Sequence, residues 1–303
     1  MNRMTGVLEL RRPYFPEERI TAMRVKGLFV AVVGAVLVFV SSCAEVGISG
    51  RQQLNFVPDG LMNSMSLQSY NEFISQNELS PDMQQREMVN RVGRRIARAV
   101  VAYCREYGMQ DTISSYKWEF NLVDSNEVNA WAMPGGKVVV YTGLLPITQN
   151  EAGLATVMGH EIAHAFAKHG AERMSHSLIF ELGGMALSKA IEEKPEQTRS
   201  LLLQAYGVGG QIGVMLPFSR VQESEADRLG LIFMAIAGYD PAEAITFWQR
   251  MSQAKKDQAN YPEFLSTHPA DATRIGDLQR HLDEAQDYGR TFAERFSQTR
   301  LAD

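Results

Sequence analysis

The sequence has few cysteines, no excess of basic residues and no apolar run long enough to cross a membrane. Cys43 and Cys104 are the only two cysteines in 303 residues, so one disulfide at most can form within the chain. The net charge of −5 gives no electrostatic support for binding nucleic acid, and we expect no such partner. Neither an internal repeat nor a low-complexity tract is present.

An apolar run near the N-terminus has the pattern of a secretory signal. Residues 27–40 are apolar and follow two basic residues, but a transmembrane helix needs about 20 such residues. Ser-Ser-Cys ends the run, and "VSSC" resembles a bacterial lipobox, whose cysteine is lipidated and becomes the first residue of the mature protein. An N-terminal anchor helix that is never cleaved is the alternative.

These features divide the N-terminal region into three predicted segments. Met23 is the better start, so residues 1–22 are interpreted as a non-native or mis-assigned extension, and residues 23–42 as a lipoprotein signal peptide. Residues 43–60 are expected to be a tether lipidated at Cys43. Cys104 would then be a lone thiol, which is usually buried.

The rest of the chain predicts a mostly helical α+β protein with one domain over residues 61–286 and a frayed tail over residues 287–303. Trp118, Phe120 and Leu122 alternate with polar residues in a predicted strand. A Pro-Gly-Gly turn between two β-prone runs predicts a further pair of strands within residues 129–145. A single helix is expected from about residue 149 to residue 177, and a pair of helices within residues 178–216.

Four of the six histidines lie between residues 157 and 176, and two of them are spaced for metal binding. His160 and His164 are four residues apart, so both would lie on one face of a helix. Glu161 lies between them. A His-Glu-x-x-His helix supplies two zinc ligands and a carboxylate base.

A catalytic zinc site needs a third protein ligand, and "SRVQESEADRLGL" offers one. Glu223 would complete the set, and Asp227, one helical turn further on, would accept the other N–H of a ligating histidine. Glu225 points about 200° away from Glu223 on a helix of 3.6 residues per turn and is the weaker candidate. A solvated acidic helix start is the alternative interpretation of residues 223–227.

The other histidines have less defined roles. His169 would be rotated about 140° from His164 on one straight helix, so we expect His169 and His176 to be structural. His268 lies in a loop next to Pro269. It could donate to a developing oxyanion, act as a fourth zinc ligand that blocks the water position, or have no role.

Four ordered segments, "NAWAMPGGKVVVYTGLL", "EAGLATVMGHEIAHAFAKHGAERM", "LPFSRVQESEADRLG" and "STHPADATRI", resemble the HtpX and CAAX-prenyl-protease-related gluzincin metallopeptidases. Within that family the sequence is most similar to the bacterial lipoprotein members of the BepA and LoiP kind. The resemblance covers residues 50–286. It implies one zinc ion at His160, His164 and Glu223, with Glu161 as base and Asp227 in support.

The resemblance also implies a small antiparallel sheet whose edge strand lines the active-site cleft. Extended substrate would add to this edge, which we place at Met133, Gly135, Gly136, Val138 and Val140. His268 corresponds to a family histidine that can close on the zinc as a latch. The family's repeat-rich partner-docking module and its multiple membrane spans are not matched.

We therefore expect a zinc metalloendopeptidase that hydrolyses unfolded or misassembled envelope proteins. It would face the periplasm from a lipid anchor on Cys43, with the outer membrane favoured. The alternative is a chaperone-like zinc protein with a latched site and low turnover. Glu161 favours the enzyme, since a structural zinc site needs no base. The substrate's sequence and the oligomeric state are left open.

Overall fold

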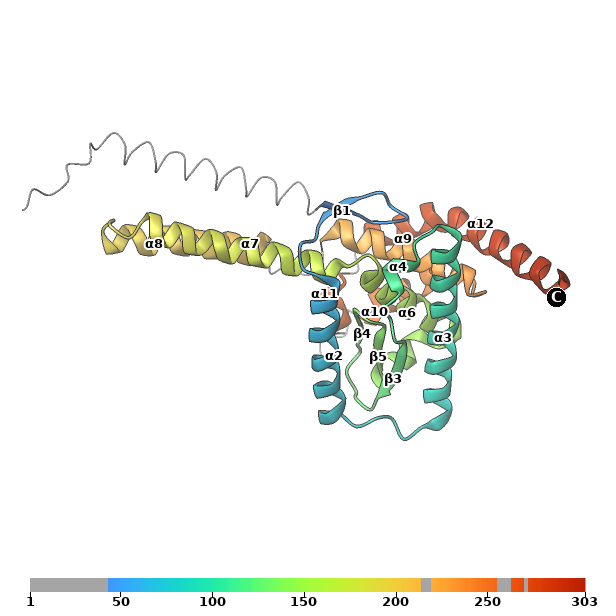
Figure 1. The fold of residues 1–303 in the computed structure, drawn as a ribbon. Coiled ribbons are helices and arrows are strands. Elements are labelled where there is room, and N and C mark those ends of the chain that lie inside the picture. Colours follow the sequence, from blue (N-terminus) through green and yellow to red (C-terminus); the bar gives the residue numbers. More distant parts are fainter. Residues whose placement is uncertain (1–42, 214–218, 255–262, 270–271, 303) are drawn as a thin grey trace, which may run out of the picture. The chain divides into compact units, whose positions relative to one another are not determined.

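The computed structural model describes residues 43–213, 219–254, 263–269 and 272–302 of the chain (Figure 1). Residues 44–303 form one compact unit. It is mostly helical with a small sheet, so the predicted α+β class is confirmed. The segments predicted as an extension (1–22) and as a signal peptide (23–42) lie outside the described residues.

The first described segment is not the free tether predicted for residues 43–60. Strands β1 (Cys43–Glu45) and β2 (Gln52–Leu54) pair with each other, and helix α2 (Asp59–Gln76) begins directly afterwards. Arg51 lies at the start of β2 and bonds to two acidic side chains more than a hundred residues further along the chain. This segment is therefore part of the folded unit.

The main sheet has three strands and is mixed, whereas an antiparallel sheet was predicted. Its order is β3 (Glu119–Val123), β5 (Lys137–Tyr141), β4 (Ala130–Met133). Strands β4 and β5 form an antiparallel hairpin, with Ala130 opposite Val140. Strand β5 lies between β4 and β3 and runs parallel to β3, with Glu119 opposite Lys137. Strand β4 is left at one edge.

The tight turn between β4 and β5 requires its two glycines. Gly135 and Gly136 have φ values of +86° and +84°, in a region that side chains with a Cβ rarely adopt. A Cβ on Gly136 would also lie 3.1 Å from the ring of Trp118. The Pro-Gly-Gly sequence therefore fixes the hairpin that places β4 at the edge of the sheet.

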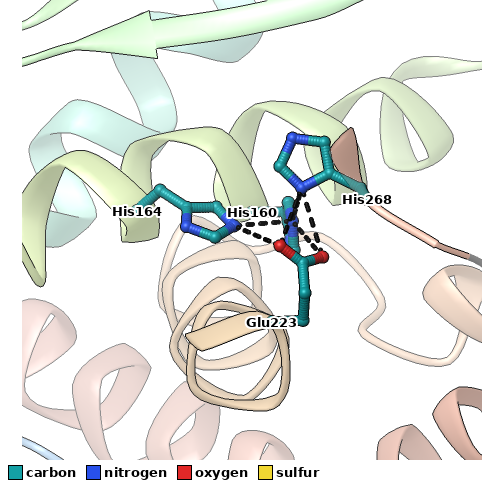
Figure 2. A group of neighbouring side chains, drawn as sticks. All are labelled: His160, His164, Glu223 and His268. Carbon is teal, nitrogen blue, oxygen red and sulfur yellow. Dashed lines mark hydrogen bonds and ion pairs between the residues drawn. The ribbon is translucent and has the colours of Figure 1, made fainter. Parts of the chain in front are cut away.

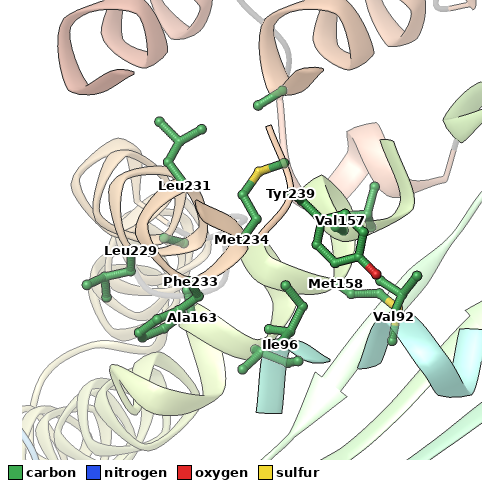
Figure 3. Packing of buried hydrophobic residues seen from close by; sticks show 14 of the residues in the cluster. Val92, Ile96, Val157, Met158, Ala163, Leu229, Leu231, Phe233, Met234 and Tyr239 are labelled. Atoms are coloured by element: carbon green, nitrogen blue, oxygen red, sulfur yellow. The ribbon is translucent and has the colours of Figure 1, made fainter. Parts of the chain in front are cut away.

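Helix α6 (Glu151–Phe166) is the centre of the helical core. Asn150 caps its first turn by accepting a hydrogen bond from the Gly153 N–H at 2.8 Å. Every residue from Gly153 to Phe166 is buried, including the polar side chains of His160, Glu161 and His164. Its side chains pack against helices α3 (Met83–Glu106) and α9 (Arg220–Ile236), where Ile96, Met158 and Phe233 belong to the same cluster (Figure 3).

The single helix predicted from residue 149 to residue 177 is wrong. Helix α6 ends at Phe166, and helix α7 (His169–Ala190) begins after a break at Lys168, whose φ is +56°. One residue in the left-handed region changes the direction of the chain, and nothing in the local sequence demands it. The break reorients His169 relative to His164.

The predicted helix pair within residues 178–216 is confirmed for the described part. Helix α8 (Glu196–Gly213) packs against α7, with the ring of Tyr206 stacked 4.4 Å from that of Phe180. A Cβ on Gly183 would lie 2.3 Å from the Tyr206 hydroxyl. This glycine therefore serves close helix packing.

The remaining helices are short, except for the last one: α4 (Gln110–Ile113), a 3-10 turn η1 (Thr142–Leu144), α5 (Leu145–Thr148), α10 (Glu243–Ala254), α11 (Phe264–Thr267) and α12 (Ala272–Ala302). The tail predicted to fray over residues 287–303 is helical as far as Ala302. Phe292 of this helix is buried, and Arg295 forms an ion pair with Glu106. These contacts extend the helix beyond its expected end.

Candidate metal centre

Side chains from three elements meet at one buried point (Figure 2). His160 and His164 come from α6, Glu223 comes from the first turn of α9, and His268 follows α11. One ligand atom of each lies within 4.8 Å of the others. His160 Nε2 is 3.0 Å from His164 Nε2 and 3.1 Å from His268 Nδ1. Glu223 Oε1 is 3.2 Å from His164 Nε2.

Two glycines bring Glu223 to the histidines. A Cβ on Gly159 would lie 3.0 Å from the carbonyl oxygen of Gly230, and a Cβ on Gly230 would lie 2.9 Å from the backbone nitrogen of His160. Helices α6 and α9 therefore cross with their backbones in contact. Ser219 fixes the start of α9 through a capping box with Gln222, so Glu223 points from the first turn of α9 toward the histidines.

Hydrogen bonds around the centre show where the protons of its two helical histidines lie. Asp227 Oδ1 is 2.9 Å from His160 Nδ1, and a carboxylate only accepts, so Nδ1 carries the proton. His169 Nε2–H likewise donates to the Glu225 carboxylate at 2.8 Å. His169 Nδ1 then accepts from His164 Nδ1 at 2.7 Å. Both Nε2 atoms consequently face Glu223, at 3.5 and 3.2 Å.

This convergence of acceptors requires a cation. Burial lowers the pKa of His160, but hydrogen bonds with Asp227 and Glu223 outweigh it and raise the pKa to about 9, so a proton takes the cation's place in the metal-free chain. Zinc binds histidine nitrogen at about 2.0–2.1 Å, which separates neighbouring ligands by roughly 3.4 Å around a tetrahedron. The observed ligand separations match that spacing, and the residues fit one zinc ion.

Glu161 lies beside the four ligand atoms and is also buried. Its Oε1 atom makes no hydrogen bond within the described part of the chain, although His268 Nε2 is 3.3 Å away. Burial raises the pKa of this carboxyl, and a hydrogen bond from the backbone N–H of Ala132 partly offsets the shift. A buried carboxylate with an unused oxygen and a raised pKa is suited to moving protons.

A second layer of polar contacts, which the sequence did not predict, supports His164. His169 bonds to it, Glu225 bonds to His169, and Arg51 donates to Glu225 at 2.9 Å. Arg51 also forms a bidentate pair with Glu172 at 2.7 and 2.9 Å. The prediction that His169 is only structural assumed a straight helix, and the break at residue 168 made that geometry wrong.

Arg274 is another contributor that the sequence did not single out. Its guanidinium donates to Glu223 at 3.0 Å and to Asp227 at 2.7 Å. It also lies 3.4 Å from the centre of the Trp248 ring. One buried cation thus holds Glu223 and Asp227 of α9 in place. Burial alone would raise the pKa of Glu223, but hydrogen bonds from His160, His164 and His268 keep it well below its usual range.

The predicted substrate edge is only partly correct. Val138 and Val140 are fully buried on the central strand β5, so neither can form an edge. Gly135 and Gly136 lie in the turn, and only Met133 belongs to β4. The Tyr141 N–H bonds to the Asn129 carbonyl at 3.1 Å. Since bonded pairs alternate along an antiparallel ladder, the backbone groups of Ala130 and Ala132 face the open edge.

The other predicted residues lie away from the centre. Cys104 is a buried free thiol, as predicted, and burial raises its pKa to about 11, which makes it unreactive. His176 is exposed on α7. Cys43 is the first residue of β1, and its side chain is not described. Among the described residues, no helix is long and apolar enough to span a membrane.

Comparisons with known proteins agree with this centre. Residues 85–282 match the profile of peptidase family M48. The chain is 32% identical to the mitochondrial metalloendopeptidase OMA1 of Schizosaccharomyces pombe over 84% of its own length and 71% of that protein. It is 36% identical to the OMA1 of Homo sapiens over 57% of its length, and 30% identical to the Beta-barrel assembly-enhancing protease of Escherichia coli over 55%.

The chain spans only 34% of the human relative and 35% of the E. coli relative. The names of the relatives contradict the predicted location at the outer membrane facing the periplasm, because the OMA1 proteins, which include the match over 84% of this chain, are mitochondrial. The lipid attachment predicted at Cys43 rested on the "VSSC" pattern, and the comparisons give it no support.

Proposed function

The chain belongs to peptidase family M48, and from this premise we propose that it is an endopeptidase that cleaves extended segments of unfolded or misassembled proteins. In this proposal His160, His164 and Glu223 hold one zinc ion, Glu161 is the catalytic base, and Asp227 orients His160. The observation that carries the proposal is the convergence of four buried ligand atoms beside a buried carboxylate with an unused oxygen.

The proposed chemistry divides between the metal and Glu161. When bound, zinc lowers the pKa of a water molecule and polarises a carbonyl group. Glu161 takes the proton from the attacking water on its free Oε1 and later gives it to the leaving nitrogen of the peptide. The raised pKa of this carboxyl favours both transfers at neutral pH.

Substrate is proposed to bind as an added strand at the open edge of β4. The backbone groups of Ala130 and Ala132 face this edge. The Ala130 N–H already donates to the Asn129 side chain at 2.9 Å and the Ala132 N–H to Glu161, so an added chain would pair with the two carbonyls and compete for the two N–H groups. A peptide in this register would pass directly beside the catalytic carboxylate. Recognition through the backbone accepts many sequences but requires an extended chain, which favours unfolded substrates over folded ones.

His268 is proposed to act as a latch. Its Nδ1 lies 3.0 Å from Glu223 and 3.1 Å from His160, in the position that a fourth zinc ligand would take. A histidine there competes with the water that hydrolysis needs. Under this proposal His268→Ala raises the rate of hydrolysis. A lower rate would instead support the alternative role of His268 as an oxyanion donor.

The test compares the zinc-loaded wild-type chain with Glu161→Gln on unfolded casein, with the zinc content of both measured. The proposal predicts cleavage by the wild type, none by the variant and one zinc in each. If neither protein cleaves casein and His268→Ala does not either, while all three retain zinc, the endopeptidase proposal fails. A chaperone-like protein with little turnover would then be the better account.

A further inference from the structure

Helix α3 lines a second concave surface, separate from the metal centre. A groove of about 960 Å³ runs between α3, strand β3 and the end of α12. None of the residues lining it belongs to the metal centre. Phe120, which lines the groove, packs so closely on α3 that a Cβ on Gly93 would lie 2.3 Å from its ring. Trp118 and Phe296 add apolar surface to the walls.

Three arginines of α3 give this groove an uncompensated positive charge. Arg94, Arg98 and Arg105 are exposed and line it. Within the described part of the chain, none of the three makes an ion pair or a hydrogen bond. The fourth lining arginine, Arg95, is already bonded to the carbonyl of Ala237 at 2.7 Å.

Acidic side chains on or beside α3 and in the lining of the groove are paired with other groups. Glu106 forms an ion pair with Arg295, and Glu151 forms one with Arg91. Glu119 lines the groove, but its carboxylate is bonded to Lys137 at 3.0 Å and to the Tyr70 hydroxyl at 2.6 Å. The groove is therefore strongly basic on a chain whose net charge is −5.

The spacing of the arginines matches an extended chain. Arg94 and Arg98 are one helical turn apart, about 6 Å along the axis. Alternate side chains of a β-strand project on the same face about 6.6 Å apart. Arg105 lies about 10 Å beyond Arg98, which corresponds to about three strand residues. Acidic residues at alternate positions of an extended peptide could thus face Arg94 and Arg98. Arg105 lies between two such positions, within reach of its long side chain.

We propose that this groove binds an acidic, extended segment of a polypeptide, through ion pairs with Arg94, Arg98 and Arg105. The apolar walls formed by Trp118 and Phe296 would hold the intervening side chains. A concave groove favours a linear ligand over a flat lipid surface. The acidic balance of the whole chain disfavours nucleic acid, whose binding depends on extended basic surface.

The experiment measures fluorescence anisotropy with the full chain carrying Glu161→Gln, so that no probe is cleaved. The labelled probe alternates glutamate and alanine over about eight residues. A peptide of the same composition with its glutamates in one block tests spacing, and a lysine–alanine peptide tests charge. Phosphatidylglycerol vesicles test a lipid surface.

The matched variants reverse two exposed arginines each: Arg94→Glu with Arg98→Glu in the groove, and Arg280→Glu with Arg290→Glu on α12. The proposal predicts that the groove variant weakens binding of the alternating probe by about tenfold or more, while the control variant binds like the parent. Raising the salt from about 0.05 to about 0.5 M should also weaken binding.

Three results would overturn the proposal: no binding of the alternating probe, equal binding by the two variants, or arginine-dependent binding of vesicles without binding of the peptide. Equal affinity for the blocked and alternating probes would contradict the proposal that the peptide binds as an extended strand with alternate residues facing the arginines. Binding is measured without turnover, so these outcomes are separate from the fate of the proposed peptidase activity.

Discussion

Replacing His169 should weaken zinc binding although this residue is not a proposed ligand. His169 is fully buried and accepts the Nδ1 proton of His164 at 2.7 Å. In His169→Phe that donor loses its acceptor, and no water can reach it. A buried donor without a partner costs about 1–3 kcal/mol, and loss of such supporting bonds typically lowers metal affinity about 10–100-fold. We therefore expect the Kd for zinc to rise about 10–100-fold.

The assay is zinc competition against a chromophoric chelator, with circular dichroism to establish that the variant is folded. His176→Phe is the matched control, because it makes the same change at an exposed position of the same helix. If His169→Phe does not fold, Glu225→Gln tests the same chain of hydrogen bonds from His164 through His169 to Glu225. This variant keeps an acceptor for His169 but removes the negative charge of residue 225. A folded His169→Phe chain whose Kd is within about twofold of the wild type would refute the reasoning.

Three further predictions concern the support of the centre. Arg51→Ala leaves Glu172 and Glu225 buried without their shared cation and should lower the free energy of unfolding by about 3 kcal/mol; an unchanged urea midpoint would contradict this. Gly230→Ala forces apart the crossing helices α6 and α9 and should lower the free energy of unfolding by about 1–3 kcal/mol. It should also weaken zinc binding in the same competition assay. A free energy of unfolding and a Kd for zinc equal to those of the wild type would argue against a tight crossing. In the metal-free chain the pKa of His160 is raised from 6.5 to about 9. The stability that this shift contributes is fully present below pH 6.5 and is lost as the pH rises to about 9. Thermal melts of chelator-treated protein should show a melting temperature that falls between pH 6.5 and 9, and a rising one would count against the shift.

The parts of the centre that depend on local helix geometry could be read from the sequence. The i, i+4 spacing places His160 and His164 on one face, and the same rule relates Glu223 to Asp227. These relations hold whatever the rest of the fold does. The structure accordingly brings His160, His164 and Glu223 together.

The supporting residues depend on features that no local pattern specifies. The left-handed Lys168 breaks the helix and turns His169 toward His164, whereas a straight helix would turn it away. Glu225 does point away from the ligands, as its position on the helix predicts, but the broken helix brings His169 to meet it there. Arg51 reaches Glu225 from a segment expected to be a tether.

The strand order was likewise set by pairing between distant residues. The strongest strand pattern, residues 137–141, was placed at the substrate edge, but a run buried on both faces belongs in the centre of a sheet. Its neighbour with mixed exposure, β4, is the edge. Burial on both sides was visible in the Val-Val-Val run and could have shown this.

The most direct test of the central claim is a zinc titration of the metal-free chain with hydrolysis of casein as the readout. The account predicts that activity rises linearly with added zinc and reaches its plateau at one zinc ion per chain, and that Glu161→Gln binds the same amount of zinc without activity. Activity that is independent of zinc, or that survives in Glu161→Gln, would contradict a metallopeptidase centre at His160, His164 and Glu223.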